Sequence, residues 1–482
     1  MNTRVTAAVL LAVGWCTAAG AQTPSAPQPA ASVPIVMPQA AAQAPGATPF
    51  IGSVPSGPAT TNTIPVSLKD AVDRALKYNL GIITGQQDVE TARGQHIGSL
   101  SGLLPSVSGT VGESLQTTNL QAFGFPSFPG IPQVLGPFSV FDARIAVSQS
   151  LVNIPALQHL REAAHRLSAS RDDFRNTRDL VVLVVANLYL RTVAASSRID
   201  AAKAERDTAQ ALAKLATDRH NAGLSARIDE LRAQVQLQVE EQRLIVAQND
   251  FDKLKLQLAR AIGLPVAQPY TLTDTIAYQP LQPPSLDDAL TIAYQSRGDY
   301  LASEERVQAA QAAKAAASGE RLPSLQLNAN YGDIGLTVGG ARETFTVAGV
   351  VAIPLFAGGR IRSAVIEAQS TLERRRAELA NLKNQIDYDV RTAFLDLKAA
   401  DDQLKVAQGA LNLANEELQQ ARDRFSAGVG DNVEVIQAQE SVATANDSYI
   451  SSLYAHNVAK ASLARALGVG EQAVERYLGG SR

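Results

Sequence analysis

Residues 323–332 of the chain, Pro-Ser-Leu-Gln-Leu-Asn-Ala-Asn-Tyr-Gly, alternate between apolar and polar side chains along a full strand length. An alternation with a period of two predicts a β-strand with one apolar and one polar face. The pattern recurs in three further segments, at about 105–117, 139–151 and 342–355, although Glu113 interrupts the apolar face of the first. The sequence therefore predicts two hairpins of amphipathic strands.

These strands are long enough to cross a membrane. A transmembrane strand needs about ten residues at a tilt, whereas a transmembrane helix needs about twenty apolar residues. The longest later apolar run, Leu180–Ala186, is too short for such a helix. Four strands cannot close a membrane barrel, and open strand edges are not tolerated in lipid. Several copies would have to share one wall, unless the hairpins are half-buried in a soluble domain.

The hairpins occupy matching places in an internal duplication. Ser67-Leu68-Lys69-Asp70-Ala71 recurs 218 residues later as Ser-Leu-Asp-Asp-Ala, and Leu104-Pro105-Ser106 recurs at the same separation. Asp218-Arg219-His220-Asn221-Ala222-Gly223 recurs 205 residues later as Asp-Arg-Phe-Ser-Ala-Gly. The extra residues of the first copy lie mainly in a loop at about 118–138. A repeated unit of this length predicts two halves with one fold.

Each strand hairpin is followed by a long segment without internal proline, from about 156 to 222 and from about 357 to 427. A helix of that length would reach on the order of 100 Å. Gly223 and Gly428 end these segments, and an amphipathic stretch returns from each, which predicts two helical hairpins with glycine turns. A seven-residue repeat in the second long segment is typical of a coiled coil. It comprises Leu397, Leu404, Leu411, Leu418 and Phe425, with Ala400, Ala407, Ala414 and Ala421 three places later.

Shorter helical stretches precede the strands, at about 80–103 and 300–321. The combined length of a short stretch and a returning stretch is close to the length of a long helix. We therefore expect each short helix to stack end to end with a returning helix, beside the long helix. Ser67 and Ser285 each precede an aspartate by three residues, which predicts a capped small helix after each serine. A proline-rich linker, 264–284, separates the two copies.

The N-terminal residues indicate export. Residues 1–21 have a basic start, an apolar run and an Ala-Gly-Ala end, the layout of a cleaved signal peptide. Residues 22–66 are rich in Pro, Ala and Thr, which predicts a flexible leader that buries little. The only cysteine, Cys16, lies in the signal, so no disulfide is expected in the mature chain. The formal charge of -3 gives no reason to expect nucleic acid as a partner.

Over about residues 65–470 the chain resembles the TolC family of outer-membrane efflux proteins. The resemblance is carried by the twin Ser-Leu-x-x-Ala openings and by Ile-Pro-Leu-Phe-Ala-Gly-Gly-Arg at 353–360, where strand passes to helix. It is also carried by the twin Ala-Gly turns and by Glu-Val-Ile-Gln-Ala-Gln at 434–439.

This resemblance implies a mostly helical α+β fold with an internal two-fold repeat. It implies a homotrimer that shares a twelve-stranded transmembrane β-barrel in outer-membrane lipid, above a coiled-coil tunnel in the periplasm. The implied function is the passive exit duct of a tripartite efflux or type I secretion system, without a cofactor. The domains would be the signal peptide 1–21, the leader 22–66, the repeats 67–263 and 285–468 around the linker 264–284, and a C-terminal tail 469–482.

The resemblance also implies where the functional residues lie. In the family, the glycine turns form the periplasmic tip, where an adaptor protein of an inner-membrane pump docks. The candidate adaptor contacts are therefore Gly223, Leu224, Gly428 and Val429. Acidic residues after the second turn ring the channel entrance and favour cations. Here Glu434 occupies one such position, whereas Gln437 occupies another, so the ring would be thinner.

The closing latch of a relative uses an aromatic residue and an arginine that flank the second turn. Phe425 and Gly430 stand at those positions here and lack the hydroxyl and the guanidinium. Asp229, near the first turn, is retained. The same latch therefore cannot form, and the entrance must be closed by other contacts.

Other classes of protein fit less well. The sequence has no His-Glu-x-x-His motif and no phosphate-binding glycine loop, and His159 and His165 lie on different helix faces, so we expect no enzyme and no metal site. A periplasmic adaptor or structural coiled-coil protein would share the signal peptide and the helical hairpins. It would not need two strand hairpins of membrane length. The exported substrate stays open among drugs, metal ions, polysaccharides and polypeptides.

Overall fold

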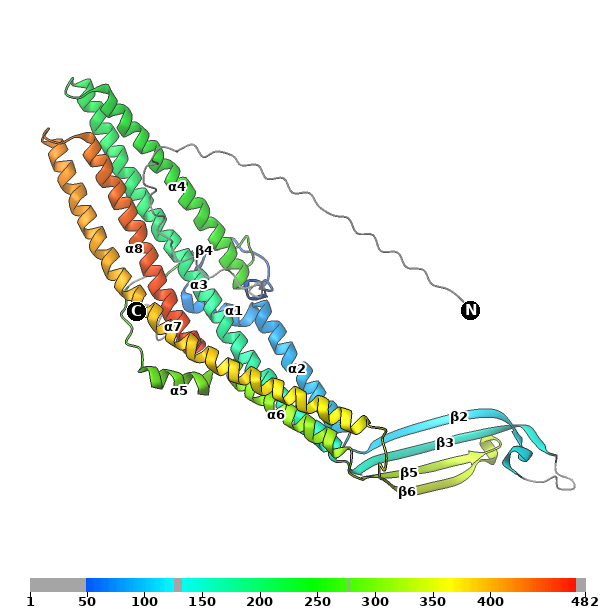
Figure 1. The fold of residues 1–482 in the computed structure, drawn as a ribbon. Coiled ribbons are helices and arrows are strands. Elements are labelled where there is room, and N and C mark those ends of the chain that lie inside the picture. The colour runs from blue at the N-terminus through cyan, green and yellow to red at the C-terminus, as the bar shows by residue number, and fades with distance from the viewer. Residues whose placement is uncertain (1–48, 125–131, 276–277, 474–482) are drawn as a thin grey trace, which may run out of the picture. The chain divides into compact units, whose positions relative to one another are not determined.

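A computed structural model describes residues 49–124, 132–275 and 278–473 of the chain (Figure 1). The chain divides into two units, Met1–Gly46 and Ala47–Arg482, and everything below concerns the second. The predicted signal peptide, most of the predicted leader and the last nine residues lie outside the described residues.

All four predicted strands are present in one antiparallel sheet. Their order is β2-β3-β5-β6, so the two hairpins join through β3 and β5. The strand predicted at about 342–355 ends earlier, at Ala352, which pairs with Ser324, the first residue of the neighbouring strand. The strands are β2 (Ser106–Asn119), β3 (Val134–Val152), β5 (Ser324–Gly335) and β6 (Arg342–Ala352).

The register places most of the large apolar residues of the four strands on one face. Ile145 pairs with Tyr331, and Tyr331 pairs with Phe345 on the next strand. Val111 of β2 lies on this face too and is 78% exposed. Within the described part of the chain, β2 and β6 each pair along one side only. The sheet therefore has two open edges and an uncovered apolar face.

The long helices form two antiparallel hairpins. Helix α3 (Ile154–Asn221) returns as α4 (Arg227–Ala261), and α7 (Arg360–Ser426) returns as α8 (Asn432–Ala466). Helix α7 begins at 360 rather than 357, because Gly358 adopts a positive φ outside the helical region. In the heptad seam, Leu411 is only half-buried, whereas the other leucines and Phe425 are buried.

The predicted short helices are present. Helices α2 (Leu80–Ser101) and α6 (Gly298–Gly319) lie in the stretches that were expected to stack, and α1 (Leu68–Tyr78) and α5 (Leu286–Ser296) are the small helices after Ser67 and Ser285. Ser67 caps α1 in a complete capping box with Asp70. At the junction of α2 and α4, Asn79 Nδ2 donates a hydrogen bond to the carbonyl of Ala261 over 3.2 Å. Helices α2 and α4 thus follow one another along α3, as Figure 1 shows.

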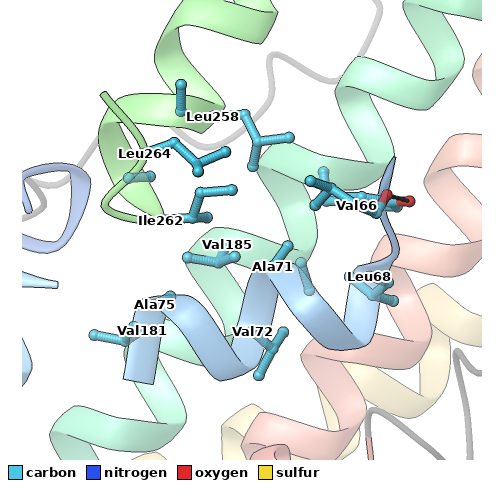
Figure 2. Close-up of a cluster of buried hydrophobic side chains, with 14 of the residues drawn as sticks. Val66, Leu68, Ala71, Val72, Ala75, Val181, Val185, Leu258, Ile262 and Leu264 are labelled. Carbon is cyan, nitrogen blue, oxygen red and sulfur yellow. Dashed lines mark hydrogen bonds between the residues drawn. The ribbon is translucent and has the colours of Figure 1, made fainter. Parts of the chain in front are cut away.

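The largest apolar core lies at this junction (Figure 2). Val181 and Val185 of α3 meet Leu258 and Ile262 at the end of α4, and all four have almost no exposed surface. The second repeat builds the equivalent core around Ile386, Val390, Leu463 and Leu467. Of the helices in the described residues, only α3 contains an apolar stretch compatible in length and composition with a membrane span, and 56% of that 18-residue window is buried. A core helix has the same composition.

One sequence expectation was wrong at this core. The leader does not bury little over residues 49–66, because β1 (Ile64–Val66) lies against α1 and Val66 is fully buried. The predicted linker also contains a strand, β4 (Tyr270–Leu272), which pairs with β1 in parallel. Each strand has only three residues, so neither carries a periodic pattern. The predicted tail includes a short helix, α9 (Gly470–Ala473).

Candidate functional site

The two helical tips have the same backbone structure. Gly223 adopts a φ of +73°, and the N–H of Leu224 donates to the carbonyl of Arg219 over 2.9 Å. Gly428 adopts a φ of +75°, and the second turn makes the equivalent bond over 3.0 Å. This left-handed C-terminal turn favours glycine, which explains the repeated Ala-Gly pair. Among the residues that the structure describes, nothing lies within 4 Å of a Cβ placed on either glycine.

Apolar side chains project from both turns. Leu224 is 77% exposed and Val429 is 72% exposed, and each directly follows the turn glycine. Ile228, at the start of α4, is also half-exposed. Exposed apolar side chains gathered at one end of a molecule are typical of a protein-binding surface.

Arg219 ties the first tip to the second. Its two Nη atoms donate to the carbonyls of Phe425 and Ser426 over 2.8 and 3.0 Å. Its guanidinium carbon also lies 4.6 Å from the centre of the Phe425 ring. These carbonyls are at the C-terminal end of α7, where a helix carries partial negative charge and lacks internal donors. The Arg219 guanidinium therefore supplies donors to the carbonyls of Phe425 and Ser426 and offsets the partial negative charge at the end of α7.

A second connection joins the first turns of α4 and α8. Asn432, which is 2% exposed, donates from Nδ2 to the backbone carbonyl of Asp229 over 3.0 Å. The Asp229 carboxylate instead lies 3.7 Å from Arg232 of its own helix. Asp229 thus contributes to the connection through its backbone, and its carboxylate does not bridge the two tips.

Glu434 and Gln437 lie on the first turns of α8. The Glu434 carboxylate is 3.3 Å from Nε of Arg424, and both side chains are about half-exposed. Gln437 is exposed, and its backbone carbonyl accepts a hydrogen bond from Ser441 over 3.1 Å. An exposed ion pair of this kind contributes little stability, because water screens both charges.

Sequence reasoning missed Arg219 and Arg424. The signal was present, because both residues belong to the repeated Asp-Arg pair before the Ala-Gly turns. The tip as a whole offers apolar side chains, arginines and exposed carboxylates, among them Glu434. Among residues 49–124, 132–275 and 278–473, no group of three His, Cys, Asp or Glu side chains could hold a metal ion.

Two helical hairpins that alternate with two strand hairpins are the fold of TolC-like outer-membrane channels. The model of the outer membrane efflux protein family matches residues 71–264 and again residues 289–469. The chain therefore belongs to the outer membrane efflux protein family. The double match confirms the predicted internal duplication.

Individual proteins show the same similarity. Outer membrane protein OprJ of Pseudomonas aeruginosa is 26% identical over 96% of this chain and 94% of its own. The pyoverdine export outer membrane protein OpmQ of Pseudomonas putida is 26% identical over 69% of this chain and 71% of its own. The crystal structure of the Campylobacter jejuni CmeC outer membrane channel superposes with a TM-score of 0.73 at 19% identity, covering 84% of this chain and 86% of that one.

These findings confirm the predicted α+β fold and the outer-membrane location. The chain is an outer-membrane channel protein, and the members of its family act as passive channels.

Proposed function

We propose that three copies of this chain form one channel, which serves as the passive exit duct of a tripartite export system. The observation that carries this proposal is the sheet of four long strands with two open edges and one uncovered apolar face. In lipid, every backbone N–H and C=O needs a partner, so open edges must pair with further strands. Three copies joined edge to edge supply a closed barrel of twelve strands, four from each copy.

The two faces of the sheet differ as a barrel wall requires. The first face carries strongly exposed apolar side chains, namely Val107, Val111, Leu115, Phe345 and Val347. The second face carries small polar side chains, namely Ser108, Thr110, Asn328, Asn330 and Thr346. A barrel of these sheets would place the first face against lipid and the second around a water-filled lumen.

The helices support the same assembly. Tyr388, Leu395, Val406 and Leu413 of α7 are each more than 60% exposed. They are spaced by 7, 11 and 7 residues, which are close to whole numbers of helical turns, so they form one apolar line. Helix α4 carries a second exposed apolar line, namely Ile228, Val235, Val239 and Val246. Neighbouring copies would cover both lines when the helices join into a tunnel.

We assign the tips to the adaptor and the entrance. Gly223, Leu224, Gly428 and Val429 would contact a periplasmic adaptor of an inner-membrane pump, because they form the exposed end of both helical hairpins. The pump would supply the energy, and this chain would catalyse no reaction. Three copies of Glu434 would concentrate negative charge at the entrance and favour cations. Gln437 adds no charge, and Arg424 reduces the field of each Glu434.

Membrane extraction tests the proposal most directly. The protein should stay in the outer-membrane fraction after a carbonate wash, migrate as a trimer in mild detergent and conduct ions in planar bilayers. A periplasmic adaptor or structural coiled-coil protein would be released by the wash or follow the inner membrane. Release as a monomer would refute the channel assignment. Affinity purification from the native envelope should then recover an adaptor, and an unchanged recovery after Leu224→Asp and Val429→Asp would remove these residues from the contact.

A further inference from the structure

The charged side chains of the sheet are divided unequally between its two faces. Residues that pair across neighbouring strands have their side chains on the same face, so the register assigns each charge to a face. Both arginines of the four strands, Arg144 and Arg342, lie on the second face, together with Asp142. The remaining carboxylates of these strands lie on the first, apolar face; they are Glu113, Asp333 and Glu343. The face proposed to line the lumen therefore carries a net positive charge.

Arg342 lies at the outer end of this face. It is the first residue of β6, whereas the last residue of β6 leads into α7, so Arg342 is at the end of the strand away from the helices. Arg342 pairs with Ile334 of β5, and Ile334 pairs with Asp142 of β3. Two strand spacings of about 4.8 Å thus separate the positions of Arg342 and Asp142.

Arg144 is neutralised within the chain, and Arg342 is not. Arg144 donates from Nε and Nη2 to the two carboxylate oxygens of Asp142, the first over 2.5 Å. A Cβ on Gly332 would lie 2.8 Å from Cγ of Arg144, so the glycine leaves space for the arginine to lie along the sheet. With the residues that the structure describes, Arg342 forms neither an ion pair nor a side-chain hydrogen bond. Arg342 therefore keeps its charge available on the second face.

A neighbouring copy would not neutralise Arg342 either. In the proposed trimer, the open edge of β6 pairs with the open edge of β2 of the next copy. The only charged residue of β2 is Glu113, which lies on the first face. The segments 114–141 and 335–341, which include the loops at this end of the sheet, contain no charged residue. Three copies would thus surround the lumen with three uncompensated arginines.

The field of these arginines would extend to the centre of the lumen. Twelve strands about 4.8 Å apart and tilted by about 40° enclose a barrel with a backbone radius of about 12 Å. The arginine side chains project inward from this radius. Because the Debye length is about 10 Å in 0.1 M salt, an ion on the barrel axis lies within about one screening length of all three charges.

We propose that the three copies of Arg342 form an anion-binding ring at the outer mouth of the lumen, and that its ligands are solutes with several carboxylate or phosphate groups. The ring rests on the proposed function, because it requires the second face to line a lumen. Its charge is opposite to that of the three copies of Glu434 at the proposed entrance. A multivalent anion would therefore be attracted at the mouth, and a cation would be repelled there.

Block of the conductance by an anion tests the ring. The probe is inorganic tripolyphosphate, applied to channels in planar bilayers in about 0.1 M KCl, where the Debye length is about 10 Å. The long helices stay in the chamber that receives the protein, so the mouth faces the opposite chamber. Tripolyphosphate in that opposite chamber should reduce the conductance of the wild type. The half-blocking concentration should rise roughly three- to ten-fold in Arg342→Gln and stay within about two-fold of the wild type in Arg342→Lys, which keeps the charge.

Glu343→Gln is the matched control, because Glu343 follows Arg342 in β6 and lies on the other face. It should change the half-blocking concentration by less than about two-fold. If Arg342→Gln does not assemble, Arg144→Gln provides a second variant, which frees the charge of Asp142 on the second face and should also weaken the block.

The possible failures of the ring and of the channel differ. A conducting wild type that tripolyphosphate does not block from the mouth side would overturn the ring and leave the proposed channel intact. An equal change in Arg342→Gln and Glu343→Gln would also overturn the ring, because only one of these residues lies on the second face. A protein that forms no conducting channel would refute the proposed function and the ring with it.

Discussion

The connection between the two tips can be tested by Arg219→Ala. The substitution removes two hydrogen bonds from a cation to the carbonyls of Phe425 and Ser426 and one contact with the Phe425 ring. One of the hydrogen bonds is exposed and the other is partly buried, so we assign about 1 kcal/mol or less to each and about 0.5 kcal/mol to the ring contact. The sum, about 2 kcal/mol, corresponds to a roughly 30-fold shift toward separated tips.

The internal duplication supplies the matched control. Arg424 occupies the position equivalent to Arg219, but its partner is the half-exposed Glu434, so Arg424→Ala should change the separation of the tips little. Spin labels on Leu224→Cys and Val429→Cys, which are both strongly exposed, would report the distance between the tips. Conductance in planar bilayers would report the entrance.

Arg219→Ala should broaden the label distances and increase the mean conductance, whereas Arg424→Ala should leave the distances unchanged. Equal label distances in wild type and Arg219→Ala would show that Arg219 does not hold the tips together. An equal effect of both arginine substitutions would refute the assignment of the connection to the α7 carbonyls, because only Arg219 reaches them.

Three further predictions concern the turn, the entrance and the core. Gly428→Val should destabilise the tip by about 1–2 kcal/mol, because a β-branched residue is strained at φ +75°, and should lose adaptor binding in pull-down experiments. Gly409→Val, inside α7, should keep adaptor binding. Glu434→Ala should reduce cation preference in reversal-potential measurements, and an unchanged preference would remove Glu434 from the entrance. Ile386→Ala, at a position with no exposed surface, should cost about 2–5 kcal/mol, measured as a lower denaturant midpoint than that of Ile366→Ala, which alters an exposed site.

The sequence predicted the elements that repeat a pattern over many residues. Alternation over residues 323–332 indicated β5, and the absence of proline over about 70 residues indicated α7. Local chemistry also predicted the ends of elements, as with Ser67 at the start of α1 and Gly223 at the tip. These signals depend on neighbours in the chain, so one sequence is enough to identify them.

Contacts between distant residues could not be predicted in the same way. Strands β1 and β4 have three residues each, and their pairing joins residues more than 200 positions apart, as in Ile64 with Tyr270. Arg219 reaches backbone carbonyls in the other repeat, and a carbonyl leaves no trace in the sequence of its residue. When a side chain binds a backbone carbonyl, the residue type of its partner gives no indication of the contact.

The same reason explains how the tip can stay connected although the latch residues of a relative are absent. Phe425 has no hydroxyl to bind a partner, yet its carbonyl and its ring both contact Arg219. Because a carbonyl is present whichever residue occupies the position, the connection tolerates the substitution that removes the side-chain latch. The two repeats present equivalent arginines, but only Arg219 crosses to the other repeat, whereas Arg424 stays with Glu434 of its own repeat. The connection between the tips therefore depends on the different partners of two equivalent arginines. It should be lost in Arg219→Ala and kept in Arg424→Ala.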